Sequence, residues 1–136
     1  MASDRLRRDR EGKAVILDSS AIFMFFEFSI GFETELTRLL GKYHIIIPRP
    51  IFNEIKLLAE KGKGKKKRIA KPALQLIDGF EIVDSDDVTS GDDSVLYLAK
   101  KFSGVVMTND RELRNRVKAA SLHTIFLRSK KHLVLD

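Results

Sequence analysis

Two aspartates each follow a short apolar run of the kind that forms β-strands. Asp18 follows residues 14–17, and Asp110 follows residues 105–107 after two polar residues. If both runs are parallel strands of one sheet, the two carboxylates emerge at the same edge, where open α/β sheets bind their ligands. Carboxylates gathered there, in a chain whose formal net charge is +6, predict metal-dependent cleavage of a phosphate backbone.

Two further acidic segments belong to the same predicted edge. Glu54 lies about one and a half turns into a helix that begins near residue 50. Asp92 and Asp93 stand at the start of another helix, after a polar loop. Because Mg²⁺ and Mn²⁺ take oxygen ligands, carboxylates at one edge suit one or two such ions. The predicted catalytic and metal-binding residues are Asp18, Glu54, Asp92 and Asp110, with Asp93 as a further metal-site residue.

The helical period separates the two neighbouring aspartates. At about 100° per residue, Asp92 lies near the inward stripe formed by Val95 and Ala99. Asp93 points one step further away. We therefore expect Asp92 to face the cluster of acids and Asp93 to lie on its phosphate side.

Each acidic residue also has an ordinary structural explanation. Asp18 can cap a helix, and Asn109 with Asp110 can form a turn or a cap. Glu54 can be an exposed helix carboxylate, and an acid at position 92 favours the helix dipole. Taken singly, these explanations are the stronger ones. The catalytic interpretation depends on all four acids lying at one edge.

The elements that must position these residues alternate along the chain. Apolar and β-branched runs predict strands at residues 14–18, 43–47, 80–83, 105–107 and 124–127, with an edge strand at 132–135. Helical periodicity predicts helices at residues 19–28, 32–40, from 50 to the glycines at 62 and 64, 67–78, 92–102 and 111–119. This alternation predicts an α/β domain with a parallel sheet and helices on both faces. We expect residues 1–12 to form a flexible basic arm and residues 13–136 to form one domain.

Basic residues are clustered in ways that favour a polyanionic partner. The densest run contains no acid between residues 61 and 71. Such patches attract nucleic acid by releasing its counterions, although short basic runs are often only solvated surface. The predicted RNA-binding residues are Lys63, Lys65, Lys66, Lys67, Arg68, Arg111 and Arg114.

Composition excludes several other classes. The chain has no cysteine, which excludes disulfides, cysteine-based zinc sites and thiol catalysis. Its N-terminus lacks the apolar core of a signal peptide, and its longest apolar stretch is too short to span a bilayer. We expect a soluble, cytoplasmic protein that does not bind membranes.

Four segments together resemble the PIN domain family of metal-dependent ribonucleases. They are residues 15–20, 47–54, 92–99 and 105–110, and the resemblance extends over roughly residues 13–127. It implies a single PIN-like domain, a three-layer α/β/α fold with about five parallel strands in the order 3-2-1-4-5. An acidic pocket would lie at the carboxyl edge of that sheet.

The resemblance also implies roles for individual positions. Asp18 matches the first-strand metal ligand, and Glu54 matches the acid that helps hold the metal-bound water. Asp92 and Asp110 match the third and fourth acids of the family. The positions expected to line the pocket are Ser20, Thr108 and Asn109.

Within this family the sequence leaves more than one function open. The paired aspartates at 92–93 and the basic end favour endonucleases of small-subunit ribosomal RNA processing, acting on ribosomal RNA or its precursor. Toxin ribonucleases of toxin–antitoxin pairs are the alternative branch, and a non-catalytic RNA-binding or ribosome-assembly scaffold is a second alternative. The aromatic block at residues 23–28 belongs to the core or covers a partner, which would be an assembly factor or a second copy in a homodimer.

Overall fold

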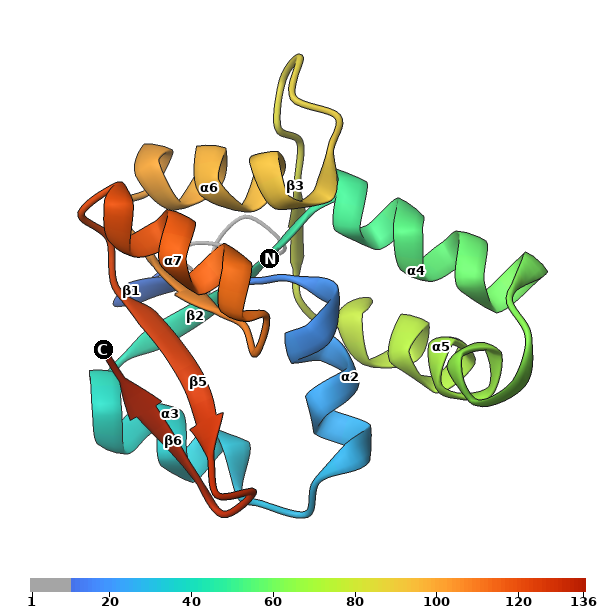
Figure 1. Ribbon diagram of the computed structural model, residues 1–136, viewed down its shortest axis with the longest axis horizontal. Helices are drawn as coiled ribbons and strands as arrows, with labels where there is room; N and C mark the ends of the chain where they lie inside the picture. The colour runs from blue at the N-terminus through green and yellow to red at the C-terminus, as the bar shows by residue number, and fades with distance from the viewer. Residues whose placement is uncertain (1–10) are drawn as a thin grey trace, which may run out of the picture.

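The computed structural model describes residues 11–136, in which one or two helices follow each of the first four strands and two consecutive strands end the chain (Figure 1). In chain order the elements are β1 (Lys13–Leu17), α2 (Ser19–Glu27), α3 (Phe32–Leu40), β2 (Tyr43–Pro48), α4 (Arg49–Lys61), α5 (Gly64–Ile77), β3 (Glu81–Val83), α6 (Gly91–Lys101), β4 (Val105–Met107), α7 (Arg111–Ala119), β5 (Thr124–Arg128) and β6 (His132–Leu135).

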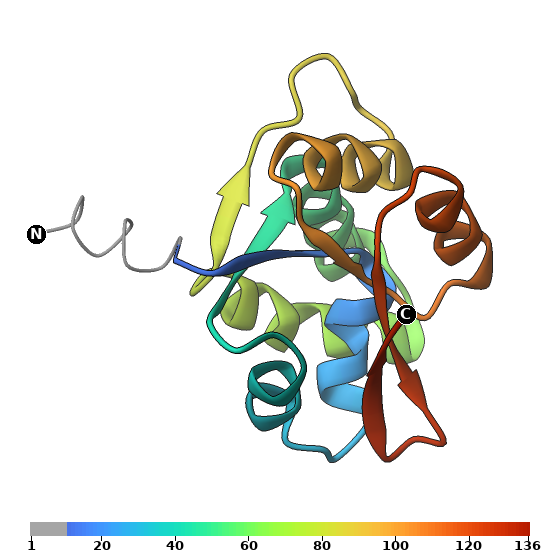
Figure 2. The same ribbon diagram turned by 90° about the vertical axis from the view of Figure 1, so that its left-hand side faces the viewer.

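The strands form one sheet in the order β3-β2-β1-β4-β5-β6. The first five strands of this order are parallel to their neighbours, and β6 is antiparallel to β5. The predicted order 3-2-1-4-5 is therefore confirmed, and the segment at 132–135 adds a sixth strand at the edge. Figure 2 shows α6 on one side of β1, with α2 and α3 on the other side.

The central strands are buried because helices cover both faces of the sheet. Residues 14–17 of β1 and all of β4 are buried, which explains why both read as continuous apolar runs without alternation. Gly104, directly before β4, allows close packing: a Cβ there would lie 2.7 Å from the carbonyl oxygen of Ala14. The strands that carry Asp18 and Asp110 are thus fixed in the middle of the core.

Helices α4 and α5 pack side by side and extend from one end of the sheet (Figure 1). The helix predicted over residues 67–78 begins earlier, at Gly64, so most of the lysine run is helical. The glycines do separate the two helices, because Gly62 ends α4 and Gly64 has a φ of +65°. Part of the basic run predicted as an interruption is therefore the first turn of α5.

Side chains from α3 close the outer edge of β6. The backbone N–H of Leu133 donates to Glu35 Oε1 at 2.9 Å, and Arg38 Nη2 donates to the carbonyl oxygen of Leu133 at 3.0 Å. Arg38 Nε also pairs with Glu35 Oε2 at 3.0 Å. The pair occupies the hydrogen-bonding groups that an additional strand would use at Leu133.

Residues 1–10, most of the predicted basic arm, lie outside the described residues. Glu11 and Gly12 lead into β1, and Glu11 Oε2 pairs with Lys42 Nζ at 3.5 Å. Within residues 11–136, no helix has the length and apolar character needed to cross a membrane.

Candidate functional site

Asp18 is buried at the carboxyl end of β1, with 4% of its surface exposed. It caps α2, because its Oδ1 accepts from the backbone N–H of Ala21 at 2.9 Å. The Ser20 hydroxyl donates to Oδ1 at 2.8 Å, and the Thr108 hydroxyl donates to Oδ2 at 2.5 Å. Both oxygens of this carboxylate are therefore held before any ligand binds.

The two hydroxyls connect Asp18 to the loop that follows β4. The backbone N–H of Asn109 donates to Ser20 Oγ at 3.1 Å, and that of Asp110 donates to Thr108 Oγ1 at 3.0 Å. Each hydroxyl thus accepts from this loop and donates to Asp18. The position of Asp110 relative to Asp18 is fixed by this relay across two adjacent strands.

Burial raises the pKa of Asp18 from 3.8 to about 6. The hydrogen bonds from Thr108, Ala21 and Ser20 oppose this rise, and repulsion from the charge of Asp92 adds to it. A nearby cation would offset both the burial and the repulsion.

Asp110 and Asp92 are exposed, and their charges influence each other. Asp110 caps α7 through one oxygen, because Oδ1 accepts from the backbone N–H groups of Glu112 and Leu113 at 2.9 and 3.2 Å. Partial desolvation raises the pKa of Asp92, and the negative charge of Asp110 raises it further. The three aspartates at positions 18, 92 and 110 are therefore electrostatically linked at one edge of the sheet.

Asp93 faces an arginine that the sequence analysis did not single out. Arg116 Nη2 of α7 donates to Asp93 Oδ1 at 2.6 Å, and this bond lowers the pKa of Asp93. The positive charge of Arg116 also lowers the pKa of Asp92, which desolvation and Asp110 raise more strongly. The basic composition of the helix that follows Asp110 is visible in the sequence. The pairing of Arg116 with Asp93 on α6 is a tertiary contact, which the composition does not indicate.

Glu54 lies on α4, beside the start of α6. A Cβ built on Gly91 would lie 3.3 Å from Glu54 Oε2 and 3.2 Å from Ile51 Cδ1. The absence of a side chain at Gly91, the residue before Asp92, leaves room for the Glu54 carboxylate. Glu54 is exposed, so its position depends on this packing more than on burial.

The donor chemistry at this edge fits a hard divalent cation. Glu54, Asp92 and Asp110 offer exposed carboxylates and Asp18 a buried one, all oxygen donors of the type that Mg²⁺ and Mn²⁺ take. Within residues 11–136, however, no three acidic or imidazole side chains already converge on a metal position. Asp92 lies close enough to Asp18 and Asp110 for their charges to repel, and a metal site would need some of the exposed carboxylates to turn inward.

The remaining predicted residues fall into separate places. Asn109 directs its Oδ1 to β5, where it accepts from the backbone N–H of Leu127 at 2.9 Å. Arg111 and Arg114 belong to the helix capped by Asp110. The predicted basic run at 63–68 lies around the turn between α4 and α5 and the start of α5. At 1.5 Å per residue, this turn begins roughly 10 Å along α4 from Glu54.

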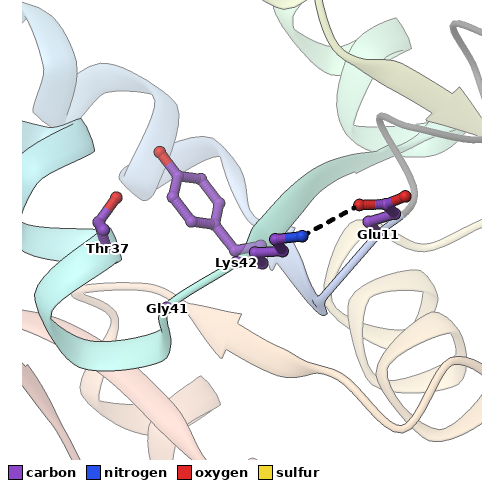
Figure 3. A pocket seen from close by; sticks show the side chains of 5 residues that line it. Glu11, Thr37, Gly41 and Lys42 are labelled. Atoms are coloured by element: carbon purple, nitrogen blue, oxygen red, sulfur yellow. Dashed lines mark ion pairs between the residues drawn. The ribbon is translucent and has the colours of Figure 1, made fainter.

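A shallow hollow of about 330 Å³ lies at the opposite edge of the sheet (Figure 3). Its lining residues are Glu11, Thr37, Gly41, Lys42 and Tyr43. Tyr43 begins β2 and pairs in register with Lys13 at the start of β1. None of the candidate acids lines this hollow.

Comparison with known proteins places this arrangement in a family. A family model described as "PIN like domain" matches residues 15–130. The chain is 26% identical over 136 residues to Ribonuclease VapC9 of Archaeoglobus fulgidus, covering 100% of this chain and 98% of the relative. It is 30% identical over 122 residues to Ribonuclease VapC4 of Methanocaldococcus jannaschii, covering 87% of this chain and 92% of the relative.

Two solved structures share the fold. The PIN domain endonuclease Utp24 superposes with a TM-score of 0.73 at 17% identity, covering 90% of both chains. A domain of a functionally unknown protein from Methanocaldococcus jannaschii superposes with a TM-score of 0.61 at 20% identity, covering 86% of this chain and 92% of that one. The resemblance carried by the four short sequence segments is confirmed, and the chain belongs to the PIN like domain family.

Proposed function

We propose that the protein is an endoribonuclease that hydrolyses RNA phosphodiesters with the help of Mg²⁺ or Mn²⁺. The observation that carries the proposal is the electrostatic linkage of Asp18, Asp92 and Asp110 at the carboxyl edge, with Glu54 beside the same helix start. Repulsion among carboxylates in a strongly basic chain is unfavourable unless a cation joins them. Two relatives that are named ribonucleases support the reaction class.

The residues have distinct roles in this proposal. Asp18 is the fixed oxygen donor, held by Ser20 and Thr108. Glu54, Asp92 and Asp110 are the movable donors that complete a site for one or two ions. When bound, such an ion supplies positive charge against the phosphate oxygens and favours ionisation of a nearby water.

Arg116 and the basic residues act on the strand rather than on the reacting atoms. Arg116 holds Asp93, so that this carboxylate is kept on the outer side of the site. In this proposal Arg111 and Arg114, which lie on the helix capped by Asp110, contact phosphates that leave the acidic edge. Phosphate contacts of this kind position a strand without reading its sequence.

The comparisons favour one branch of the family. Both curated relatives are ribonucleases of the VapC type, which supports a toxin-type ribonuclease more than an enzyme of ribosomal RNA processing. The ribosomal reading rests on the paired aspartates at 92–93 and on the basic end of the chain. The likeness to Utp24, at 17% identity, shows the fold alone.

Replacement of Asp18 and Asp110 by Asn in one variant tests the proposed activity. With Mn²⁺ and a labelled single-stranded RNA, we expect cleavage to fall by at least about a hundredfold, because both changes remove charge from the metal site. Binding of the same RNA without divalent metal should persist. Asp86→Asn is the control, because Asp86, in the loop between β3 and α6, pairs with Lys101 at the end of α6 and with none of the four acids.

The outcomes separate the alternatives. Cleavage by the double variant at the wild-type rate would show that the four acids are not the catalytic residues. Metal-independent RNA binding without any cleavage by the wild-type protein would support the scaffold function instead.

A further inference from the structure

An arginine guanidinium lies over a phenylalanine ring on the helix and strand that follow Asp110. The guanidinium carbon of Arg114, on α7, lies 3.6 Å from the centroid of the Phe126 ring on β5. Arg128, two residues further along β5, lies 5.8 Å from the same centroid. Phe126 is only 8% exposed but is not a member of the hydrophobic core cluster, so we attribute part of its burial to cover from Arg114.

This stack is attached to the loop that carries Asp110. The backbone N–H of Arg114 donates to the carbonyl oxygen of Asp110 at 3.0 Å, one turn away on α7. The Asn109 side chain is bonded to Leu127, the residue between Phe126 and Arg128. Arg114 therefore lies within one helical turn of Asp110, where an RNA strand bound at the acidic edge would reach it.

The guanidinium of Arg114 is not used by another protein group. Its Nε is buried without a hydrogen-bond partner, and no ion pair holds Arg114 within residues 11–136. The neighbouring cations of α7 differ, because Arg116 pairs with Asp93 and Lys118 pairs with Asp136. Arg114 is thus a planar cation that lies over Phe126 and makes no ion pair within residues 11–136, although its charge helps to lower the pKa of Asp136.

We propose that the outer face of the Arg114 guanidinium, supported by Phe126 and flanked by Arg128, is a stacking site for one unpaired base of an RNA strand. Guanidinium planes stack on aromatic rings and on bases exposed in single strands. The site rests on the proposed function, because the strand it binds is the one presented to the acidic edge. It adds to that function a contact with one base, beside the contacts with phosphates.

The competing explanation is that Arg114 only shields Phe126 from water. A lysine would preserve that shield, since its methylene chain covers apolar surface, and would keep the charge. It would lose the flat face that a base requires. Arg114→Lys therefore separates the two roles.

The test compares two oligonucleotides of the same length in fluorescence anisotropy without divalent metal. One is single-stranded RNA, and the other carries abasic positions throughout. We expect wild-type protein to bind the first more tightly and Arg114→Lys to lose roughly tenfold affinity for it, within the range measured for base stacking. Affinity for the abasic strand should stay unchanged, because the charge is retained.

Arg49→Lys is the matched control, because Arg49 also lies over a phenylalanine but is paired with Asp84. It should alter neither affinity. If Arg114→Lys fails to fold, Phe126→Leu replaces it in the test. This variant keeps a buried apolar side chain, removes the ring and should cause the same loss of affinity.

If Arg114→Lys loses the same affinity for both oligonucleotides, or loses none, the stacking site is overturned while the proposed ribonuclease activity stands. Failure of wild-type protein to bind either strand would overturn both proposals. If wild-type protein shows the base preference but no Mn²⁺-dependent cleavage, only the ribonuclease proposal is overturned, because binding is measured without metal.

Discussion

Asp18 and its three acidic companions are held in place by different forces. Asp18 is 4% exposed and receives hydrogen bonds from Ala21, Ser20 and Thr108, whereas Glu54, Asp92 and Asp110 lie exposed to solvent. Folding alone therefore positions Asp18, at the free-energy cost of burying its carboxylate. In the proposed metal site the exposed carboxylates would be adjustable, and repulsion between Asp92 and Asp110 would oppose its closure without a cation.

The largest expected effect concerns the burial of Asp18. Its folded pKa of about 6 exceeds the ordinary value of 3.8, so between these values the folded state binds more protons than the unfolded state. The stability contributed by the protonated group is fully present below about pH 4 and is lost as the pH rises through about 6. About two pH units correspond to about 2–3 kcal/mol.

We expect Asp18→Asn to remove this decline, as measured by urea unfolding from pH 4 to pH 7 in the presence of a chelator. Asp93→Asn is the contrast at an exposed carboxylate, because Arg116 lowers the pKa of Asp93. Asp93 contributes stability above the ordinary carboxylate pKa that is lost as the pH falls, so its removal acts with the opposite sign. An unchanged pH profile in Asp18→Asn would show that burial does not strain this carboxylate.

A smaller effect tests whether the hydroxyl groups bonded to Asp18 hold its carboxylate in place. Thr108 and Thr124 are both fully buried, but Thr108 bonds to Asp18 while Thr124 Oγ1 has no hydrogen-bond partner within residues 11–136. Thr108→Val should lower the free energy of unfolding by about 1–2 kcal/mol, because it removes a hydrogen bond to a charged group. Thr124→Val should leave it unchanged or raise it, because it removes an unsatisfied buried hydroxyl.

Thermal and urea unfolding of both valine variants at pH 7 provides the measurement. Equal destabilisation by the two substitutions would mean that the relay contributes no more than an ordinary buried threonine does.

The smallest effect is expected at one of the exposed carboxylates. Gly91→Ala places a methyl group about 3.3 Å from Glu54 Oε2, which requires the carboxylate to move by a few tenths of an ångström. We expect a roughly two- to fivefold weaker apparent affinity for Mn²⁺, equivalent to about 0.5–1 kcal/mol, measured by calorimetry. Gly79→Ala, where a Cβ meets only an ordinary contact at 3.5 Å from Leu76 O, is the neutral control. If Gly91→Ala binds Mn²⁺ as wild type does, Glu54 does not depend on this glycine.

The sequence predicts what depends on local patterns. The apolar run before Asp18, its capping role and the parallel strand order follow from residue types, spacing and resemblance, and the structure agrees. The relay through Thr108, the Asp93–Arg116 pair and the space beside Gly91 join segments that are distant in sequence. Those contacts depend on the register of strands and the approach of helices, which no single segment encodes.

The early start of α5 shows the same limit at a smaller scale. Two glycines in a lysine run indicate a break, but they do not show on which side of the break the lysines lie. The residues that α5 adds at its start, 64–66, are exposed, so no apolar periodicity in the sequence indicates that they are helical.

The Glu35–Arg38 pair of α3, which binds the backbone of β6, restricts how copies of the protein can associate. An exposed strand edge is a template for adding a strand from another chain, and this is a common origin of aggregation. At Leu133 both backbone groups of that template are already occupied by Glu35 and Arg38. A sheet continuous across two molecules would first have to break this pair at β6. A homodimer built by extending the sheet at β6 is therefore disfavoured, whereas Phe26 on α2 and Leu57 on α4 are large apolar side chains left exposed elsewhere.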